Sequence, residues 1–202
     1  EYVDNYLAFD YVRYNGTGGV SYNQGQLDTS TPRLYSANSL WVRQTATQLE
    51  YGASVFGIRT PSFDMPTTGT ARYIGSLGGY LFRQNTATFM TGGAIFDVNF
   101  ATSRADFQLN PAVQETGAGG EVVFQAYEDF VGVAVISDNT LLGNFQGVNT
   151  PTLTGSMSGA FFGIAAEEIG GTFTFGNENV YGVGAFTSPI DGDSTNTVNT
   201  GN

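Results

Sequence analysis

The segment that decides the fold reads Gly159-Ala-Phe-Phe-Gly-Ile-Ala-Ala-Glu-Glu-Ile-Gly-Gly-Thr-Phe173. Because side chains alternate along a strand, Phe161 and Phe162 point to opposite faces, so one fills an interior and the other packs outside it. Gly163 lets the chain turn, and the four residues after Ile164 can form one helical turn. A glycine pair then permits the coiling that barrel closure needs. The positions that define this hairpin are Gly159, Phe161, Phe162, Gly163, Glu167, Glu168, Gly170 and Gly171.

The rest of the chain consists of short runs rich in Val, Phe, Tyr and Thr, separated by Gly, Asn, Asp and Pro. This pattern is typical of short antiparallel strands. About eight strands closing on themselves would leave no exposed edge, so the sequence predicts an all-β fold with an eight-stranded antiparallel barrel. The predicted runs after residue 67 are 69–75, 79–83, 92–100, 104–110, 120–127, 130–136, 142–148, 155–163, 169–175 and 180–186.

A proline-flanked stretch, Arg59–Pro66, cannot continue a central strand and marks a boundary. We predict a small β-rich handle subdomain over residues 1–65, with strands at 2–14, 19–24, 33–43 and 47–58, and a barrel over residues 66–187. Residues 188–202 have almost no apolar surface to bury, so we predict a flexible acidic tail there.

The composition excludes several functions. The net charge is −11, with seven Arg, no Lys, no His and no Cys. Nucleic-acid binding is disfavoured because phosphates need clustered cations. Disulfides, zinc–thiolate sites, Cys nucleophiles and Ser–His triads are absent. No apolar run is long enough for a transmembrane helix. The chain begins at Glu1 without Met, which indicates a mature or trimmed form with any export signal or lipidated Cys upstream.

The adjacent acids Glu167 and Glu168 do not form a glycosidase pair. Neighbouring side chains diverge, whereas paired carboxylates must flank one bond. We interpret one of them as an acceptor of backbone N–H groups at the turn. An enzyme that uses only Asp and Glu stays open as a third hypothesis. We predict no enzyme, no catalytic residue and no metal site.

Three further motifs accompany the hairpin: Pro66–Gly75 (Pro-Thr-Thr-Gly-Thr-Ala-Arg-Tyr-Ile-Gly), Gly93–Phe100 and Gly143–Gly147. In this order they resemble the barrel motifs of the transferrin-binding protein B superfamily of bacterial surface proteins. The resemblance covers residues 66–186. It departs from the family pattern at Ile164, where a Pro is usual, and at Asn99, where an Asp is usual.

The resemblance implies a barrel preceded by a handle, on the extracellular or outer-membrane surface of a Gram-negative bacterium. Relatives bind transferrin, factor H, haemoglobin or haem through variable loops. We therefore expect a non-enzymatic binding protein that captures a nutrient ligand, either a haem or iron source or its carrier protein, with an outer-membrane receptor as a further partner. The alternative is a structural extracellular subunit that self-assembles through strand edges of residues 1–58.

A stretch over residues 76–92 is predicted to be a long binding loop because it mixes aromatic, Met and Arg residues with small polar ones. The candidate ligand-binding residues there are Tyr80, Phe82, Arg83 and Met90. No cofactor is predicted. Haem would need Tyr or Met as its axial ligand, because His and Cys are missing, and Arg83 could pair with a propionate. The alternative is barrel core plus a solvated Arg.

Two further candidates, Trp41 and Arg43, belong to the predicted handle. Trp and Arg dominate interface hot spots, so they could anchor a partner. Our favoured interpretation is that Trp41 belongs to the handle core.

Overall fold

The computed structural model describes residues 20–23, 35–44, 49–84 and 86–192, with the backbone alone for residues 20–23 and 44. Within these ranges the one helical element is a short 3-10 helix, Ser62–Asp64, and no helix is long and apolar enough to span a membrane. The predicted strand over 2–14 and residues 193–202 of the predicted tail lie outside the described residues.

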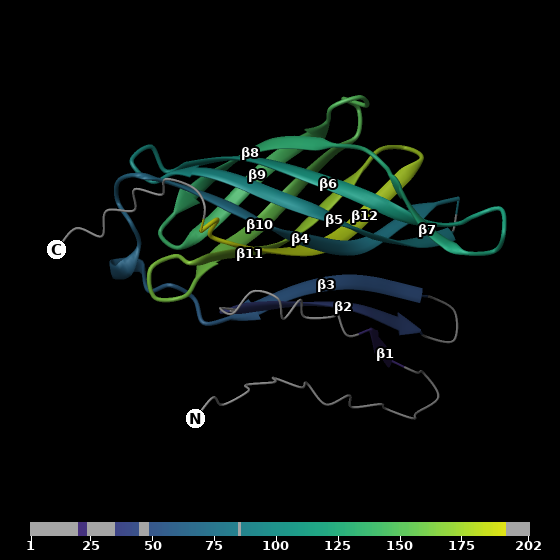
Figure 1. Cartoon of the computed structure of the whole chain (residues 1–202), viewed down its shortest axis with the longest axis horizontal. Helices are drawn as coiled ribbons and strands as arrows, with labels where there is room; N and C mark the ends of the chain where they lie inside the picture. Colours follow the sequence, from purple (N-terminus) through teal and green to yellow (C-terminus); the bar gives the residue numbers. More distant parts are fainter. Residues whose placement is uncertain (1–19, 24–34, 45–48, 85, 193–202) are drawn as a thin grey trace.

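Eight antiparallel strands form a closed barrel, which confirms the predicted fold (Figure 1). Hydrogen bonds join the strands in the order β5-β4-β12-β11-β10-β9-β8-β6, and a β5–β6 pairing closes the ring. A short strand, β7 (Val122–Ala126), pairs with the C-terminal half of β6, so that β6 and β7 form a hairpin. The barrel strands are β4 (Thr70–Arg83), β5 (Thr86–Asn99), β6 (Arg104–Thr116), β8 (Phe130–Ser137), β9 (Thr140–Gly147), β10 (Thr154–Phe162), β11 (Glu168–Gly176) and β12 (Val180–Pro189).

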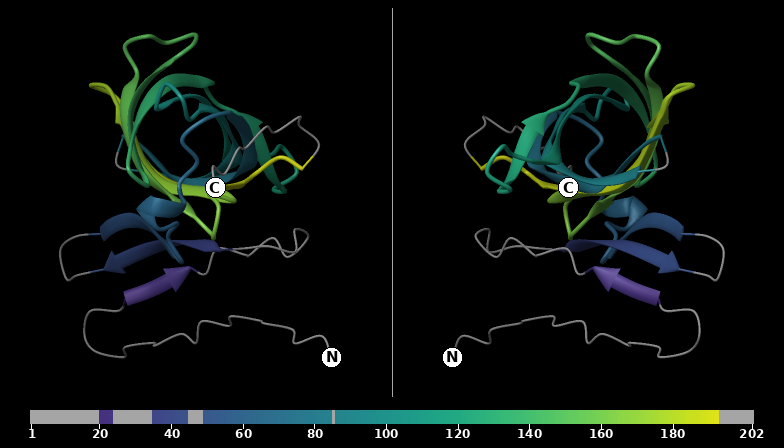
Figure 2. Two further views of the ribbon diagram at one scale, coloured as in Figure 1. Left: turned by 90° about the vertical axis from the view of Figure 1, so that its left-hand side faces the viewer. Right: turned by 90° about the vertical axis from the view of Figure 1, so that its right-hand side faces the viewer.

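A separate three-stranded sheet precedes the barrel, and we call it the handle. It consists of β1 (Val20–Asn23), β2 (Ser36–Gln44) and β3 (Leu49–Gly57) in the order β1-β2-β3. Figure 2 shows this sheet lying against one side of the barrel wall. β2 and β3 contact β11 and β12 there.

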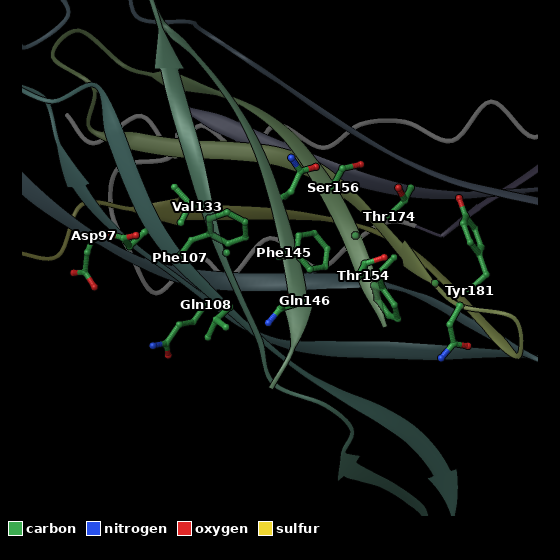
Figure 3. Close-up of a pocket in the computed structure, with 18 residues that line it drawn as sticks. Asp97, Phe107, Gln108, Val133, Phe145, Gln146, Thr154, Ser156, Thr174 and Tyr181 are labelled. Carbon is green, nitrogen blue, oxygen red and sulfur yellow. The ribbon is translucent and has the colours of Figure 1, made fainter. Parts of the chain in front are cut away.

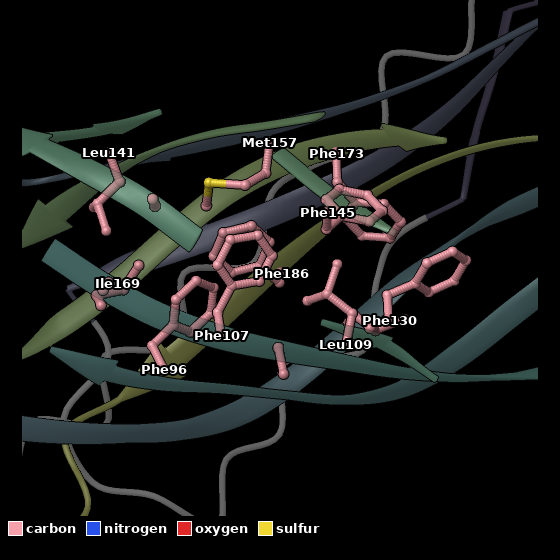
Figure 4. Packing of buried hydrophobic residues seen from close by; sticks show 14 of the residues in the cluster. Phe96, Phe107, Leu109, Phe130, Leu141, Phe145, Met157, Ile169, Phe173 and Phe186 are labelled. Carbon is pink, nitrogen blue, oxygen red and sulfur yellow. The ribbon is translucent and has the colours of Figure 1, made fainter. Parts of the chain in front are cut away.

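Aromatic rings fill the barrel interior because glycines on neighbouring strands make room for them (Figure 4). A Cβ atom added at Gly155 would overlap the ring of Phe145, and one added at Gly182 would overlap Phe175. Gly184 is related to Phe173 in the same way. A ring that lies flat over a glycine covers backbone that would otherwise be poorly packed. The interior is therefore a packed core.

The decisive hairpin follows the alternation predicted from its sequence. Phe161 is fully buried in the barrel core. Phe162 is also buried, but it lies outside the barrel, where its ring approaches Gly57 of the handle. Gly163 has a φ of 93° and begins the turn. The predicted helical turn is wrong, because Ala166 also adopts a positive φ of 58° and the chain forms an irregular turn instead.

Two other predictions fail. Residues 76–92 form no long loop: β4 ends at Arg83 and pairs with β5, which begins at Thr86, so the two runs 69–75 and 79–83 are one strand. A glycine within this stretch allows close packing, since Gly78 faces Leu40 of the handle. The tail also begins later than predicted. Ser188 and Pro189 belong to β12, and Ile190 forms a bridge with Tyr73.

Candidate functional site: an aromatic face between handle and barrel

The handle sheet has two faces because its side chains alternate. Tyr51 of β3 and Leu40 of β2 face the barrel, where Leu40 meets Gly78. Trp41 lies on the opposite face and covers Gly52 of the paired strand. Arg43 is exposed on that same face and forms an ion pair with Glu50. The handle candidates Trp41 and Arg43 therefore point away from the barrel.

A continuous series of six aromatic rings, joined by five ring contacts, runs over the outside of the barrel beneath and beside the handle. We call it the aromatic ladder. Tyr51 has its ring centroid 4.9 Å from that of Tyr80 and 4.8 Å from that of Phe82, so the handle strand joins two rings of β4. The remaining contacts are Phe82–Tyr181 at 6.0 Å, Tyr80–Phe89 at 6.1 Å and Phe89–Phe124 at 6.3 Å. The ladder residues in spatial order are Phe124, Phe89, Tyr80, Tyr51, Phe82 and Tyr181.

One end of the ladder borders a cleft of about 650 Å³ between β3 and the β4–β5 and β11–β12 turns. Apolar surface remains accessible there, because Leu49 is 55% exposed and Tyr181 is 50% exposed. The polar groups at its rim come from Gln84 and the turn that contains Glu178. We call it the junction cleft, and it is lined by Leu49, Tyr51, Phe82, Gln84, Ala87 and residues 177–181.

The structure separates the four candidates of residues 76–92. Tyr80 and Phe82 point outward and belong to the ladder. Tyr80 is almost completely buried, and its hydroxyl group has no hydrogen-bond partner in the described part of the chain. Met90 points inward and is fully buried in the core, as the alternative interpretation predicted. The Arg83 guanidinium lies 4.7 Å from the centre of the Tyr127 ring.

This arrangement separates the two candidate donors for haem iron. Tyr80 and Met90 lie on opposite faces of the barrel wall, so they cannot ligate one iron atom. Among the described residues no three His, Cys, Asp or Glu side chains are grouped in a way that could hold a metal ion. The ladder and cleft consist instead of apolar and aromatic surface with a polar rim, which suits non-covalent binding.

Four ladder residues are missing from the sequence prediction: Tyr51, Phe89, Phe124 and Tyr181. Each lies in a strand at an outward position, where the hydrophobic pattern alone suggests ordinary sheet surface. The available signal was their alternation with inward residues, such as Phe89 next to Met90. This signal becomes useful only once the strand register is known.

At the other end of the handle, Glu168 connects the handle to the barrel. Its carboxylate accepts hydrogen bonds from the backbone N–H of Tyr35 at 2.9 Å and of Ser36 at 2.8 Å, and from the Ser36 hydroxyl at 2.8 Å. Glu167 accepts a hydrogen bond from the Ala165 N–H at 3.1 Å. Both acids therefore act as acceptors of backbone N–H groups, as the sequence indicated for one of them. Burial raises the pKa of Glu168, whereas the hydrogen bonds from Ser36 and Tyr35 lower it.

The raised pKa of Glu168 leads to a testable pH dependence. Because the folded state holds the proton more tightly than the unfolded state, the contribution to stability is fully present below the unfolded pKa and is lost as pH rises through the folded pKa. We expect the free energy of unfolding of the wild type, relative to Glu168→Gln, to fall as the pH rises above the ordinary glutamate pKa of about 4.3. Urea denaturation at several pH values measures it, with the exposed Glu178→Gln as control. Parallel pH profiles for the wild type and Glu168→Gln would contradict the assignment.

Comparison with known proteins identifies the family of the barrel. The family model described as the C-lobe and N-lobe beta barrels of Tf-binding protein B matches residues 65–188. Transferrin-binding protein B of Haemophilus influenzae strain Rd is 36% identical over 142 residues, which cover 64% of this chain and 23% of the relative. The protein of strain 86-028NP is 33% identical over 143 residues and is covered to 22%. This chain thus spans about a quarter of the length of the curated relatives it matches.

Solved structures show the same fold at lower identity. Isotype 1 transferrin-binding protein B from serogroup B Neisseria meningitidis has a TM-score of 0.54 at 21% identity, over 87% of this chain and 33% of that one. A mutant transferrin-binding protein B from Actinobacillus pleuropneumoniae H49 has a TM-score of 0.55 at 15% identity, over 84% of this chain and 82% of that one. The family model covers more than half of the chain, and the closed barrel agrees with it. This chain therefore belongs to the family of the transferrin-binding protein B barrels.

Proposed function

We propose that this protein is a non-enzymatic binding protein on the outer surface of a Gram-negative bacterium, and that it captures an iron-carrier protein of the transferrin type. The aromatic ladder is the observation that carries the proposal. Its two ends are accessible, with Phe124 47% and Tyr181 50% exposed. Exposed aromatic side chains are typical of interface hot spots, because they supply large contact areas at a small entropic cost.

The extent of the ladder favours a protein partner over a small nutrient. Its rings come from β7, β5, β4, β3 and β12, so they extend over several strands beyond the junction cleft. A small ligand would use a single concave site. The net charge of −11 would also speed association with a basic surface on the partner. Similarity to proteins named for transferrin binding supports capture over self-assembly.

Surface plasmon resonance with the full chain tests this proposal. The probes are iron-loaded and iron-free transferrins from human, pig and cattle. We expect saturable binding of at least one of them, and about 30-fold weaker binding by Phe124→Ala or Tyr181→Ala, which corresponds to the 2 kcal/mol typical of a hot spot. Both residues are exposed, so neither change should unfold the protein.

The matched control is Leu142→Ala, an apolar residue of β9 that is 62% exposed and lies outside the ladder. It should bind like the wild type. Binding that is equally strong in Phe124→Ala, Tyr181→Ala and Leu142→Ala would remove the ladder as the site. Absence of binding to every transferrin would overturn the proposed partner.

A further inference from the structure

The outer wall of the barrel carries a second concave feature, a groove of about 1,270 Å³. It crosses β6, β8, β9, β10 and β11, and Asp97 and Tyr181 lie at opposite ends of the labelled residues (Figure 3). We call it the wall groove. Its volume exceeds the roughly 300–1,000 Å³ of sites for compact small ligands, so an elongated ligand fits it better.

The wall groove is rich in side-chain amides and hydroxyls that are available for hydrogen bonds to a ligand. Six side chains on four strands make no hydrogen bond to any other residue that the structure describes. Amides and hydroxyls each both donate and accept hydrogen bonds. Strand pairing sets them in rows, since Asn144 lies opposite Ser156 and Gln146 lies opposite Thr154. The six residues are Gln108, Asn144, Gln146, Thr154, Ser156 and Thr174.

The lining disfavours several other classes of ligand. No Arg lines the groove, and Asp97 and Asp106 already form ion pairs with Arg72 and Arg104, so a phosphate or another anion would find no partner. A flat apolar cofactor would cover the amides and hydroxyls of the lining without giving them hydrogen-bond partners. A protein partner is less favoured, because Phe107, Phe145 and Phe175 of the lining are buried in the barrel core and no Arg lines the groove.

We propose that the wall groove binds a neutral oligosaccharide. Sugar hydroxyls both donate and accept hydrogen bonds, which matches the rows of amides and hydroxyls. The apolar C–H faces of sugar rings have two complementary surfaces, the half-exposed ring of Tyr181 at one end and the exposed side chains of Val131 and Val133. This inference concerns a different surface from the ladder and stands independently of carrier capture, although Tyr181 borders both sites.

The same chemistry is present in a free polysaccharide and in a glycan attached to a host protein, and the choice of probes separates them. The full chain is titrated calorimetrically with maltohexaose, mannohexaose, chitohexaose and a desialylated biantennary N-glycan. We expect at least one of these to bind saturably. Binding of the N-glycan alone would identify a glycoprotein as the source, and binding of a hexasaccharide alone would identify a polysaccharide.

The double variant Asn144→Ala/Gln146→Ala tests the location. Both side chains are exposed and uncommitted, so the fold should persist, which circular dichroism verifies. We expect at least tenfold weaker oligosaccharide binding. The matched control is Val148→Ala, an exposed residue that follows the same strand but does not line the groove, and its binding should be unchanged. Gln108→Ala provides a second groove variant, on β6.

Two results would overturn the inference: no binding of any neutral probe, or binding that survives both groove variants. The carrier-capture proposal and the oligosaccharide proposal can each be overturned without affecting the other. The double variant should keep its transferrin binding, and Phe124→Ala should keep its oligosaccharide binding. Absence of transferrin binding in the wild type would leave the oligosaccharide result unaffected.

Discussion

Replacing Phe161 by Ala should lower the free energy of unfolding by about 3–5 kcal/mol. The ring is fully buried at the end of the barrel where the hairpin turns, and its centroid lies 6.0 Å from that of Tyr73 and 5.8 Å from that of Phe100. Hydrogen-bonded strands surround it, so the neighbours cannot collapse fully into the space left behind. The loss would combine the transfer free energy of the ring with the cost of a cavity. Urea denaturation measures it.

Ile164→Ala is the matched control, because Ile164 lies in the same hairpin but is 69% exposed. Its free energy of unfolding should stay within about 0.5 kcal/mol of the wild-type value. Equal losses for Phe161→Ala and Ile164→Ala would show that the hairpin does not bury Phe161 as described.

Replacing Gly75 by Ala should destabilise the protein by about 3 kcal/mol or more, at or beyond the upper end of overpacking effects. The added methyl group would overlap the Thr187 carbonyl oxygen and the backbone of Ser188. Here β12 crosses close to β4, and the Ser188 hydroxyl donates a hydrogen bond to the Ala94 carbonyl at 3.2 Å. Because the obstacle is backbone, a change of rotamer cannot relieve the overlap. The melting temperature and urea denaturation report the loss.

Gly93→Ala is the control for this substitution, because Gly93 lies on the neighbouring strand β5 and pairs with Ser76. A methyl group at Gly93 would have only the Gly75 carbonyl oxygen nearby, at 4.0 Å. Its stability should be unchanged or higher by up to about 1 kcal/mol, since glycine costs entropy within a strand. If Gly75→Ala were as mild as Gly93→Ala, barrel closure at β4 and β12 would be looser than the structure indicates.

The sequence predicted those features of the barrel that depend on residues close together in the chain. Alternation placed Phe161 and Phe162 on opposite faces of one strand, and the structure buries Phe161 inside the barrel and Phe162 outside it. The proline-flanked segment after Arg59 does separate the handle strands from the barrel strands. These features depend on neighbours in sequence, so a single chain carries enough information.

The errors come from contacts between residues far apart in sequence. Gly78 and Gly79 fall within the stretch predicted as a binding loop, although they make room for Leu40 and Met90, respectively. Ser188 looked like the start of a tail, but it is buried by its hydrogen bond to the Ala94 carbonyl. Composition cannot separate a glycine in a turn from one beneath a side chain, because both allow close approach of another group.

The candidate site was found only in part for the same reason. Tyr80 and Phe82 were named for being aromatic and close to Arg83, and both belong to the ladder. Their grouping with Arg83 and Met90 was wrong, because alternation sends these two to the inner face. Tyr51 joins the ladder only through docking of the handle, which no local pattern predicts.

The pairing of β4 with β12 determines when the ladder is complete during folding. The strands are about a hundred residues apart, and contacts of such separation form late and slowly. The Phe82–Tyr181 contact bridges these two strands, while the Tyr51 contacts need the docked handle as well. A chain that is still emerging, or one that has lost its last strand, would therefore present scattered rings instead of a continuous face. Recognition at this surface would be restricted to fully folded molecules.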